Sequence, residues 1–384
     1  MKKRKITITT GTRADYGFLR PVLNAISASS KLEYYLIVTG MHLSKKHGKS
    51  ISEIKVDGFR IYDTIDMMPH GNTNYHMSLA LADGIKSFSK IFKKCKPEIN
   101  LVFGDRDEQL ASAIAAYHMN IPNAHIHGGD VSGGIDEYNR HAITKMSNIH
   151  FAATKKSKNR IVRMGENPKN VFFTGSPAID AIYRKDISTK KELEKKYDLQ
   201  IKGNEILLLF HPVTTESHKS ETQIIAVLDA IKKLKMNTIA IAPNNDAGNY
   251  FIFKHLESYS KKYEFIHLYP NLPRKDFLGF LKYFGALVGN SSSGLIEGTY
   301  FRIPVVNVGI RQKNREKGKN IIDIQKISSK KIQETLKNIL KNSKKVNKNS
   351  VNTVYGTGNA SLKIVKILEI TTLGENLIQK QLLY

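Results

Sequence analysis

The chain is poor in cysteine and in long apolar stretches, and both shortages limit what it can be. Its single cysteine, Cys95, cannot form an intramolecular disulfide, which agrees with a reducing compartment. No stretch approaches the roughly 20 apolar residues of a membrane span. The basic start, Met1–Lys5, is followed only by the short segment Ile6–Thr10, without the apolar block and cleavage site of a signal peptide. We therefore expect a cytoplasmic protein with no membrane partner.

Several catalytic and cofactor-binding motifs are also missing. The first glycine-bearing turn, Thr10–Gly17, lacks the Gly-Lys-Ser/Thr end of a P-loop and the Gly-x-Gly-x-x-Gly pattern of nicotinamide-binding domains. There is no Gly-x-Ser-x-Gly elbow and no His-Glu-x-x-His pair. Cys95 stands among lysines with no partner motif, which disfavours cysteine catalysis. We expect no cofactor.

Acidic residues are few beside basic ones. The chain has 34 Asp and Glu against 60 Lys and Arg, so its formal net charge is +26. Such a charge indicates either nucleic-acid binding or a lysine-rich solvated surface. The lysines are spread along the chain without a stripe of interleaved aromatics, which favours the surface interpretation and no nucleic-acid partner. Arginine is more informative, because Arg13, Arg106 and Arg311 each follow a strand-like run and the guanidinium suits phosphate.

What the sequence does contain is a repeated order of strand, glycine-bearing turn and helix. Short β-branched runs alternate with helical periodicity, which predicts parallel sheets covered by helices on both faces. A helix is expected at Phe18–Ala28, after the first strand and turn. The predicted strands are Ile6–Thr10, Glu33–Thr39, Asn100–Phe103, Asn123–Ile126, His150–Thr154 and Val171–Thr174, then Glu205–Phe210, Thr238–Ala242, Phe265–Leu268, Gly285–Val288 and Pro304–Val308.

This pattern predicts an α/β protein of two Rossmann-like, doubly wound domains with a central cleft. We place the N-terminal domain at residues 1–178 and the C-terminal, nucleotide-binding domain at 179–360. A helix over 361–384 is expected to pack back on the first domain. Because open α/β sheets bind ligands at the carboxyl ends of their strands, the polar residues that follow the strands should meet in the cleft.

Two polar clusters have the character of anion sites. Gly289–Gly294 passes from a strand through serines into a helix, so its free backbone N–H groups suit a diphosphate. Arg311 would face the same anion, and Glu297 lies one turn into the helix, within reach of ribose hydroxyls. The alternative is a serine N-cap with a nearby carboxylate. Thr10–Gly17 with Arg13 is a weaker signal, because it equally fits a strand-to-helix turn with a surface salt bridge.

The other clusters bring carboxylates and imidazoles to strand ends. Asp105 and Arg106, with Glu108 close by, form either an acid–base arrangement or a structural ion pair. His42 and His211 are lone histidines at strand ends, and a residue of this kind is structural or catalytic. The predicted site edge therefore holds several groups that can move protons.

A further cluster lies between His125 and His141 around a glycine-rich loop. Its acid–base candidates are Asp130, Asp136 and Glu137, and His127 is expected to bind the substrate. A metal site of His125, His127 and Asp130 is an alternative, which we disfavour because the intervening glycines suit close approach of a substrate. We expect no metal.

Taken together, these segments resemble the hydrolysing UDP-N-acetylglucosamine 2-epimerases of sialic-acid and related nonulosonate biosynthesis. The resemblance spans nearly the whole chain in the family's order. The Arg-Ala-Asp-Tyr form of the first turn separates it from the non-hydrolysing epimerases, whose turn reads Gly-Thr-Arg-Pro-Glu. The matching segments are Thr10–Gly17, Gly40–Leu43, Gly104–Arg106, His125–Gly129, Arg140–Met146, His211–Thr215, Pro243–Gly248 and Gly289–Gly294, with Glu297 and Arg311.

The resemblance implies the two-domain fold of the GT-B glycosyltransferases and a reaction in two steps. The nucleoside diphosphate is first eliminated across C1–C2 to give a 2-acetamidoglucal. Water then adds to the alkene with inversion at C2, which releases N-acetylmannosamine and UDP. This chemistry needs a base for the weakly acidic C2 proton, an acid, and strong stabilisation of the leaving diphosphate.

The resemblance also implies residue roles. Ser291, Ser292, Arg106 and Arg311 would hold the diphosphate, and Glu297 the ribose. Arg13 and the backbone near Leu272 would lie by the nucleobase, and His211 and Asn244 by the phosphates and sugar. The acid–base candidates are Asp105, Asp130, Asp136 and Glu137, with His42 near the sugar.

Two residues depart from the family pattern. His127 stands where some members carry glutamate, and Asp130 where many do, so the choice of catalytic base stays open. A GDP- or UDP-linked 2,4-diacetamido-2,4,6-trideoxyglucose, on the legionaminic-acid route, remains an alternative substrate. A GT-B glycosyltransferase, a nucleic-acid-binding protein and a sugar-nucleotide sensor are alternative functions. The resemblance further implies a homodimer or homotetramer.

Overall fold

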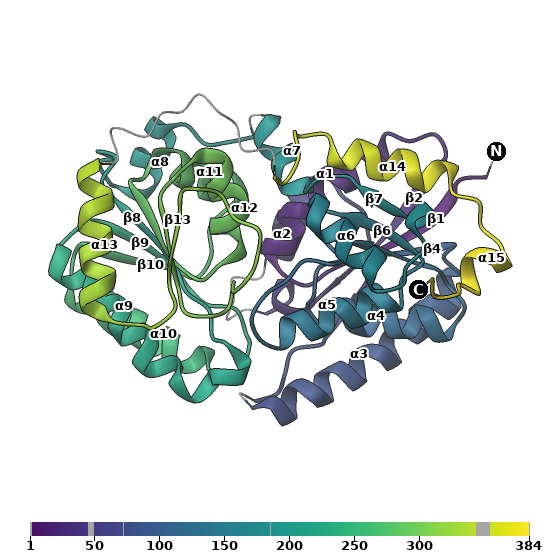
Figure 1. Cartoon of the computed structure of the whole chain (residues 1–384), viewed down its shortest axis with the longest axis horizontal. Helices are drawn as coiled ribbons and strands as arrows, with labels where there is room; N and C mark the ends of the chain where they lie inside the picture. The colour runs from purple at the N-terminus through teal and green to yellow at the C-terminus, as the bar shows by residue number, and fades with distance from the viewer. Residues whose placement is uncertain (1, 45–49, 72, 185, 343–353, 384) are drawn as a thin grey trace.

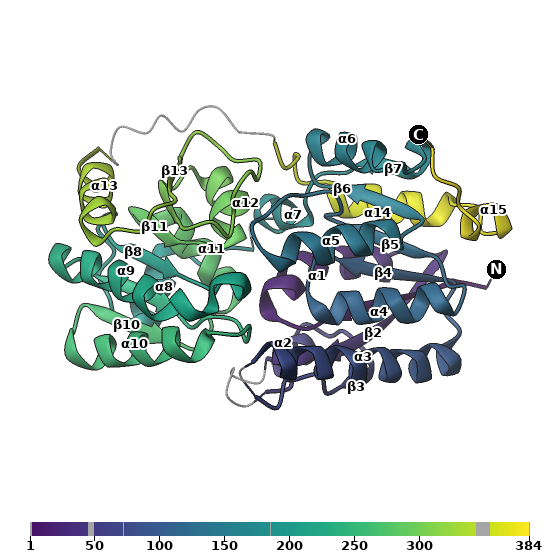
Figure 2. The same cartoon turned by 60° about the horizontal axis from the view of Figure 1, so that its bottom comes forward.

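The computed structural model describes residues 2–44, 50–71, 73–184, 186–342 and 354–383. Over these residues the chain forms two lobes side by side, each built on one parallel sheet with helices packed on it (Figures 1 and 2). The strand order is β3-β2-β1-β4-β5-β6-β7 in the N-terminal lobe and β10-β9-β8-β11-β12-β13 in the C-terminal lobe. In each sheet the order reverses beside the strand that starts the lobe, as in doubly wound folds.

The N-terminal lobe alternates strands and helices along the chain. Its strands are β1 (Arg4–Thr10), β2 (Leu32–Thr39), β3 (Ile61–Ile65), β4 (Ile99–Phe103), β5 (Asn123–Ile126), β6 (Ile149–Ala152) and β7 (Val171–Phe173). Its helices are α1 (Arg13–Ser27), α2 (Ile51–Val56), α3 (Asn74–Cys95), α4 (Asp107–His118), α5 (Ile135–Lys145), α6 (Lys155–Arg163) and α7 (Pro177–Tyr183), with 3₁₀ turns at Gly40–His42 and Pro168–Asn170.

The C-terminal lobe repeats the pattern. Its strands are β8 (Ile206–Leu209), β9 (Thr238–Ile241), β10 (Ile266–Tyr269), β11 (Ala286–Gly289), β12 (Val305–Val308) and β13 (Ile321–Ile324). Its helices are α8 (Lys190–Tyr197), α9 (Ser220–Leu234), α10 (Asn249–Lys262), α11 (Arg274–Tyr283), α12 (Ser292–Phe301) and α13 (Ser329–Asn342), with a 3₁₀ segment at Thr214–Lys219. The chain then returns to the first lobe as α14 (Ala360–Ile370) and α15 (Glu375–Ile378), yellow in Figure 1.

Burial explains why these short apolar runs become strands. The central strands β1, β4, β8 and β11 are buried on both faces, as expected where helices cover both sides of a parallel sheet. At the end of β11, a Cβ on Gly289 would lie 2.0 Å from the carbonyl oxygen of Leu209, so only glycine permits this close approach of two strands. The approach directs the chain into the serines that start α12.

The predicted two-lobed, doubly wound α/β class is confirmed, but some element boundaries were wrong. The first helix begins at Arg13 rather than Phe18, because Thr12 and Asp15 cap each other's backbone N–H groups in a capping box. Strands β3 and β13 and helix α3 are among the elements that were not predicted from the sequence. The tail expected as one helix over 361–384 is two helices, α14 and α15, separated by a non-helical stretch at 371–374.

The C-terminal tail lies on the N-terminal lobe. Helix α14 packs against α1 and α7, and both carboxylate oxygens of Asp180 accept hydrogen bonds from its first turn. The predicted domain boundary at 178/179 falls inside α7, which contacts helices of both lobes, so it remains a prediction. Over the described residues, none of the helices combines the length and apolar character of a membrane span.

Candidate active site

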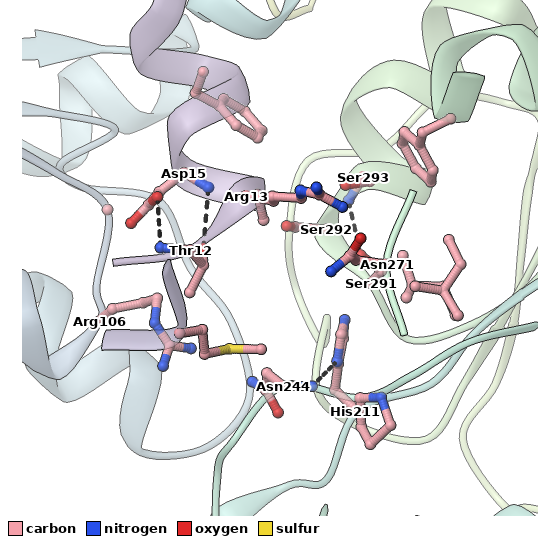
Figure 3. A pocket seen from close by; sticks show the side chains of 18 of the residues that line it. Thr12, Arg13, Asp15, Arg106, His211, Asn244, Asn271, Ser291, Ser292 and Ser293 are labelled. Carbon is pink, nitrogen blue, oxygen red and sulfur yellow. Dashed lines mark hydrogen bonds between the residues drawn. The ribbon is translucent and has the colours of Figure 1, made fainter. Parts of the chain in front are cut away.

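A cavity of about 240 Å³ lies where the carboxyl ends of the two sheets face each other. Figure 3 shows side chains from both lobes converging on it: Thr12, Arg13 and Arg106 from one side, and His211, Asn244, Asn271 and Ser291–Ser293 from the other. The cavity therefore joins segments that are up to about 300 residues apart in the chain, as expected for a ligand site between doubly wound lobes. Its remaining contacts include Asp105, His127, Arg140, Leu272, Arg274, Arg311 and Arg315.

The N-terminus of α12 forms one wall of the cavity. Ser291 caps this helix by accepting a hydrogen bond from the backbone N–H of Ser293 at 3.3 Å. The first backbone N–H groups of a helix lack intrahelical partners and carry a partial positive charge, so they attract anions. Asn290 fixes this turn, because its side chain exchanges two hydrogen bonds with the backbone of His211, at 2.7 and 2.8 Å. The arrangement suits a phosphate group.

His211 lies in the cavity as a neutral hydrogen-bond donor. The backbone N–H of Asn244 donates to its Nδ1 at 3.1 Å, which requires that nitrogen to be unprotonated. Burial, together with Arg311 and Arg106, lowers the pKa of His211 well below its ordinary value. The proton of the neutral ring therefore sits on Nε2, and this edge points toward Ser291 in Figure 3.

Six arginines line the described cavity, and each has its own carboxylate. Arg13 forms an ion pair with Glu53, Arg140 with Asp105 and Arg274 with Glu297. Arg311 pairs with Asp136, and Arg315 pairs with Asp130. Arg106 contacts Glu108 at 3.1 Å and Asp246 at 3.6 Å. Of these seven carboxylates only those of Glu53 and Asp105 reach the cavity surface. The guanidinium groups therefore face the cavity while most of their counter-charges lie behind them.

Three of these arginine contacts cross between the lobes. Arg106 of the N-terminal lobe reaches Asp246, whereas Arg311 and Arg315 of the C-terminal lobe reach Asp136 and Asp130. The backbone N–H of Gly133 also donates to the carbonyl of Arg311 at 2.8 Å. Some of the side chains that line the cavity thus also tie the two lobes together.

Asp105 is the only predicted acid–base carboxylate that lines the cavity. It follows β4 at the turn that begins with Gly104 and is paired with the guanidinium of Arg140. Arg140 is 2% exposed, and its Nη1 donates to the carbonyl of Asp130 and to the hydroxyl of Ser132, both at 3.1 Å. A buried arginine therefore holds the Asp105 carboxylate at the cavity surface.

His127 lines the cavity but is engaged at both nitrogens. Nδ1 lies 3.2 Å from Asp130 and Nε2 lies 2.8 Å from the hydroxyl of Ser176. Burial alone would raise the pKa of Asp130, but His127, Arg315 and Ser157 outweigh it and hold that pKa below its usual range. The order Ser176–His127–Asp130 resembles a hydrolytic triad, yet Ser176 is 1% exposed and is not in contact with the cavity. We read the group as a fixed support for the cavity wall.

The structure brings ten of the predicted site residues to the cavity: Arg13, Asp105, Arg106, His127, His211, Asn244, Leu272, Ser291, Ser292 and Arg311. Five others are not in contact with it: His42, Asp130, Asp136, Glu137 and Glu297. The roles of these five residues remain predictions. Asp130, Asp136 and Glu297 are paired with cavity arginines, so any effect they have on a ligand would pass through those arginines.

His42 and Glu137 have local structural partners. His42 is fully buried between the hydroxyls of Thr10 at 3.0 Å and Ser50 at 2.7 Å, and burial lowers its pKa to about 4. Glu137 accepts a hydrogen bond from the backbone N–H of Ser132 at 2.8 Å. Each contact fixes a loop that borders the cavity.

Three cavity arginines were not predicted as site residues. Arg140 stood inside a matching segment, so its position there was a usable signal. Arg274 and Arg315 lie on α11 and beyond β12, and only the packing of the lobes brings them to the cavity. His125, the first member of the metal alternative, instead hydrogen-bonds the carbonyl of Gly104 at 2.8 Å. Among the described residues, no three His, Cys, Asp or Glu side chains gather as a metal site would require.

The geometry predicts that the cavity binds inorganic pyrophosphate and that Arg311 contributes directly. Arg311→Ala should raise the Kd for pyrophosphate about 10- to 100-fold, because a charge-assisted contact is lost. Arg160→Ala is the matched control, since Arg160 pairs with Glu316 across the lobes but does not line the cavity. Isothermal titration calorimetry measures both. Equal weakening in the two variants would show that Arg311 acts only by holding the lobes together.

Comparison with known proteins agrees with this site. The family model for UDP-N-acetylglucosamine 2-epimerase matches residues 24–369. A Legionella pneumophila protein described as UDP-N,N'-diacetylbacillosamine 2-epimerase (hydrolyzing) is 36% identical over 98% of both chains. A Neisseria meningitidis protein described as UDP-N-acetylglucosamine 2-epimerase is 35% identical over 83% of both chains.

The fold is also found among solved structures. The crystal structure of a UDP-GlcNAc 2-epimerase from Neisseria meningitidis bound to UDP-GlcNAc superposes with a TM-score of 0.78. The superposition covers 95% of this chain and 99% of the Neisseria chain, at 19% sequence identity. The similarity at this level of identity shows a shared fold. The family expected from the sequence motifs is thus confirmed by the family match and by relatives that cover most or all of the chain. The chain belongs to the UDP-N-acetylglucosamine 2-epimerase family.

Proposed function

We propose that the protein is a hydrolysing sugar-nucleotide 2-epimerase that converts UDP-N-acetylglucosamine into N-acetylmannosamine and UDP. One observation carries the proposal: a helix N-terminus with serines and arginines faces the Asp105 carboxylate across the same cavity. The first group suits a leaving diphosphate and the second suits abstraction of a proton from carbon. An elimination at C1–C2 needs both at once.

In the first step, Asp105 takes the proton from C2 of the sugar while the bond between C1 and the diphosphate oxygen breaks. The electron pair of the C–H bond forms the C1=C2 double bond, and the C1–O pair leaves with UDP. The α12 N-terminus, Arg311 and the Nε2–H of His211 offset the charge that develops on the diphosphate. These donors are already in place, so little reorganisation is needed during the reaction.

In the second step, water adds to the 2-acetamidoglucal. Its oxygen bonds to C1 and a proton is delivered to C2 on the face opposite to the one that lost it, which gives the manno configuration. Arg140 keeps Asp105 at the cavity surface in both steps, and Glu108, Asn245 and Asp246 fix Arg106 in the cavity wall, where it would contact the diphosphate. The ties between the lobes limit the entry of bulk water.

A second candidate substrate is a UDP- or GDP-linked 2,4-diacetamido-2,4,6-trideoxyglucose. The Legionella relative described with a diacetylbacillosamine substrate matches this chain over 98% of its length, further than the Neisseria relative does. The elimination is the same for both sugars, because C1 and the 2-acetamido group do not differ. We further propose that the enzyme acts in the cytoplasm on nonulosonate precursors, as a homodimer or homotetramer.

Proton NMR in D2O tests the reaction and its substrate together. Incubation with UDP-N-acetylglucosamine should give UDP and N-acetylmannosamine that carries deuterium at C2, because the solvent supplies the added proton. A parallel tube holds the GDP- or UDP-linked diacetamido sugar, and turnover there alone would identify the second candidate. Folded protein that releases no nucleotide in either tube contradicts the epimerase proposal and favours a transferase or a sensor.

Asp105→Asn should lower kcat by about 10²- to 10⁴-fold, because general-base catalysis contributes roughly that much. The Kd for UDP should stay within about threefold, since Asp105 acts on the sugar. Asp107→Asn is the matched control two residues away, because Asp107 accepts a hydrogen bond from Asn139 at 2.9 Å and does not line the cavity. A variant Asp105→Asn with wild-type kcat would move the base to another group.

A further inference from the structure

The cavity wall beyond α12 holds a buried ion pair of unusual character. Nη2 of Arg274, at the start of α11, lies 2.6 Å from Oε1 of Glu297 on α12. The Glu297 side chain is fully buried and that of Arg274 is 11% exposed. Only Arg274 reaches the cavity, so Glu297 lies behind it. A charge pair this deep costs desolvation energy, which good hydrogen bonds normally offset.

Here those hydrogen bonds are not made. Within the described residues, both carboxylate oxygens of Glu297 and the Nε and Nη2 atoms of Arg274 lack a partner with hydrogen-bond geometry. All four atoms are shielded from solvent, and Nη2 and Oε1 are the two atoms of the 2.6 Å ion pair, so charge attraction rather than aligned hydrogen bonds holds Arg274 and Glu297 together. Nη1 is the guanidinium nitrogen of Arg274 outside this buried set, so it is the donor that Arg274 offers to a ligand in the cavity.

Two aromatic rings pack near the Arg274 guanidinium. Its Cζ lies 5.5 Å from the ring centroid of Phe18 and 5.9 Å from that of Phe277. Gly17 makes room for this path, because a Cβ there would lie 2.9 Å from Cδ of Arg274. Because these rings and Glu297 restrict the Arg274 side chain, its cavity-facing donor can discriminate between an acceptor and a donor on a planar group.

The position along α12 indicates which part of a ligand lies here. Glu297 is six residues beyond the Ser291 cap, so the Arg274–Glu297 pair lies about 9 Å along the helix axis from the phosphate-binding turn. That separation matches the reach of a nucleoside from its 5′-phosphate. Leu272 and Asn271, which also line the cavity, provide an apolar surface and an amide on the same side.

We propose that Arg274 determines nucleobase specificity by donating to a carbonyl oxygen on the base, and that Glu297 positions it. A guanidinium has donors and no acceptor, so it favours a 4-oxo pyrimidine or 6-oxo purine over the corresponding 4-amino or 6-amino base. The predicted partner is therefore uracil or guanine rather than cytosine or adenine. This inference rests on the proposed function only in assuming that a nucleoside diphosphate fills the cavity.

The test compares nucleoside diphosphates on wild-type protein and on Arg274→Lys by isothermal titration calorimetry. Lysine keeps the positive charge beside Glu297 but lacks the planar fork. Wild-type protein should bind UDP about tenfold more tightly than CDP, and the preference should fall to within about twofold in the variant. The Kd for inorganic pyrophosphate should change by less than about twofold, which shows that the phosphate site and fold are intact.

Arg20→Lys is the matched control. Arg20 also pairs with carboxylates, those of Asp57 and Asp186, but it does not line the cavity, so the UDP-to-CDP preference should not change. A tenfold preference for GDP over ADP that collapses in Arg274→Lys supports the inference with guanine as the base. 2′-DeoxyUDP reports on the ribose separately.

Three results would overturn the inference. The variant could keep the wild-type preference for UDP over CDP, it could lose pyrophosphate affinity to the same extent as UDP affinity, or it could lose the penalty for 2′-deoxyUDP instead. The second result makes Arg274 a phosphate ligand and the third makes it a ribose ligand. Failure of the proposed function looks different, because wild-type protein would then bind no nucleoside diphosphate at all.

Discussion

The site depends on the pairing of every cavity arginine with a carboxylate. An arginine cannot lose its charge at neutral pH, so six of them can surround one cavity only if counter-charges lie close by. The carboxylates of Asp130, Asp136 and Glu297 lie behind Arg315, Arg311 and Arg274, away from the cavity. These guanidinium groups thereby line the cavity with their carboxylates on the far side.

The same pairing links binding to the arrangement of the lobes. Contacts from Arg106, Arg311 and Arg315 cross the cleft, and each of these arginines also lines the cavity. A bound diphosphate would compete for these guanidinium groups, so its charge and the closure of the lobes are coupled. Asp105 is held by Arg140 within one lobe, whereas the proposed phosphate-binding wall belongs to the other.

Local sequence patterns were sufficient to predict much of the site. Short apolar runs mark the carboxyl ends of buried strands in the sequence, and this predicts that Asp105, His211 and Ser291 lie at one edge, where the structure has them lining the same cavity. The first turn was harder, because the capping box of Thr12 and Asp15 starts α1 five residues before the apolar pattern does. Missed strands such as β3 and β13 are edge strands with weaker burial patterns.

What the sequence could not provide was the pairing between lobes. In the sequence, Asp130 and Asp136 are acid–base candidates. Their neighbouring residues do not show that each carboxylate is paired with an arginine more than 170 residues away, Asp130 with Arg315 and Asp136 with Arg311. His42 follows a strand like a catalytic histidine, yet the packing of Thr10 and Ser50 around it decides its environment. Arg274 carries no motif, and only the fold brings it to Phe18 and Glu297.

The central claim is that this cavity breaks the bond between C1 of the sugar and the diphosphate oxygen. Turnover in water enriched in oxygen-18, followed by mass spectrometry of both products, tests it most directly. Elimination followed by hydration places the label on the sugar, at C1, and leaves UDP unlabelled. Label in the terminal phosphate of UDP, with none in the sugar, would show cleavage at phosphorus and contradict the account.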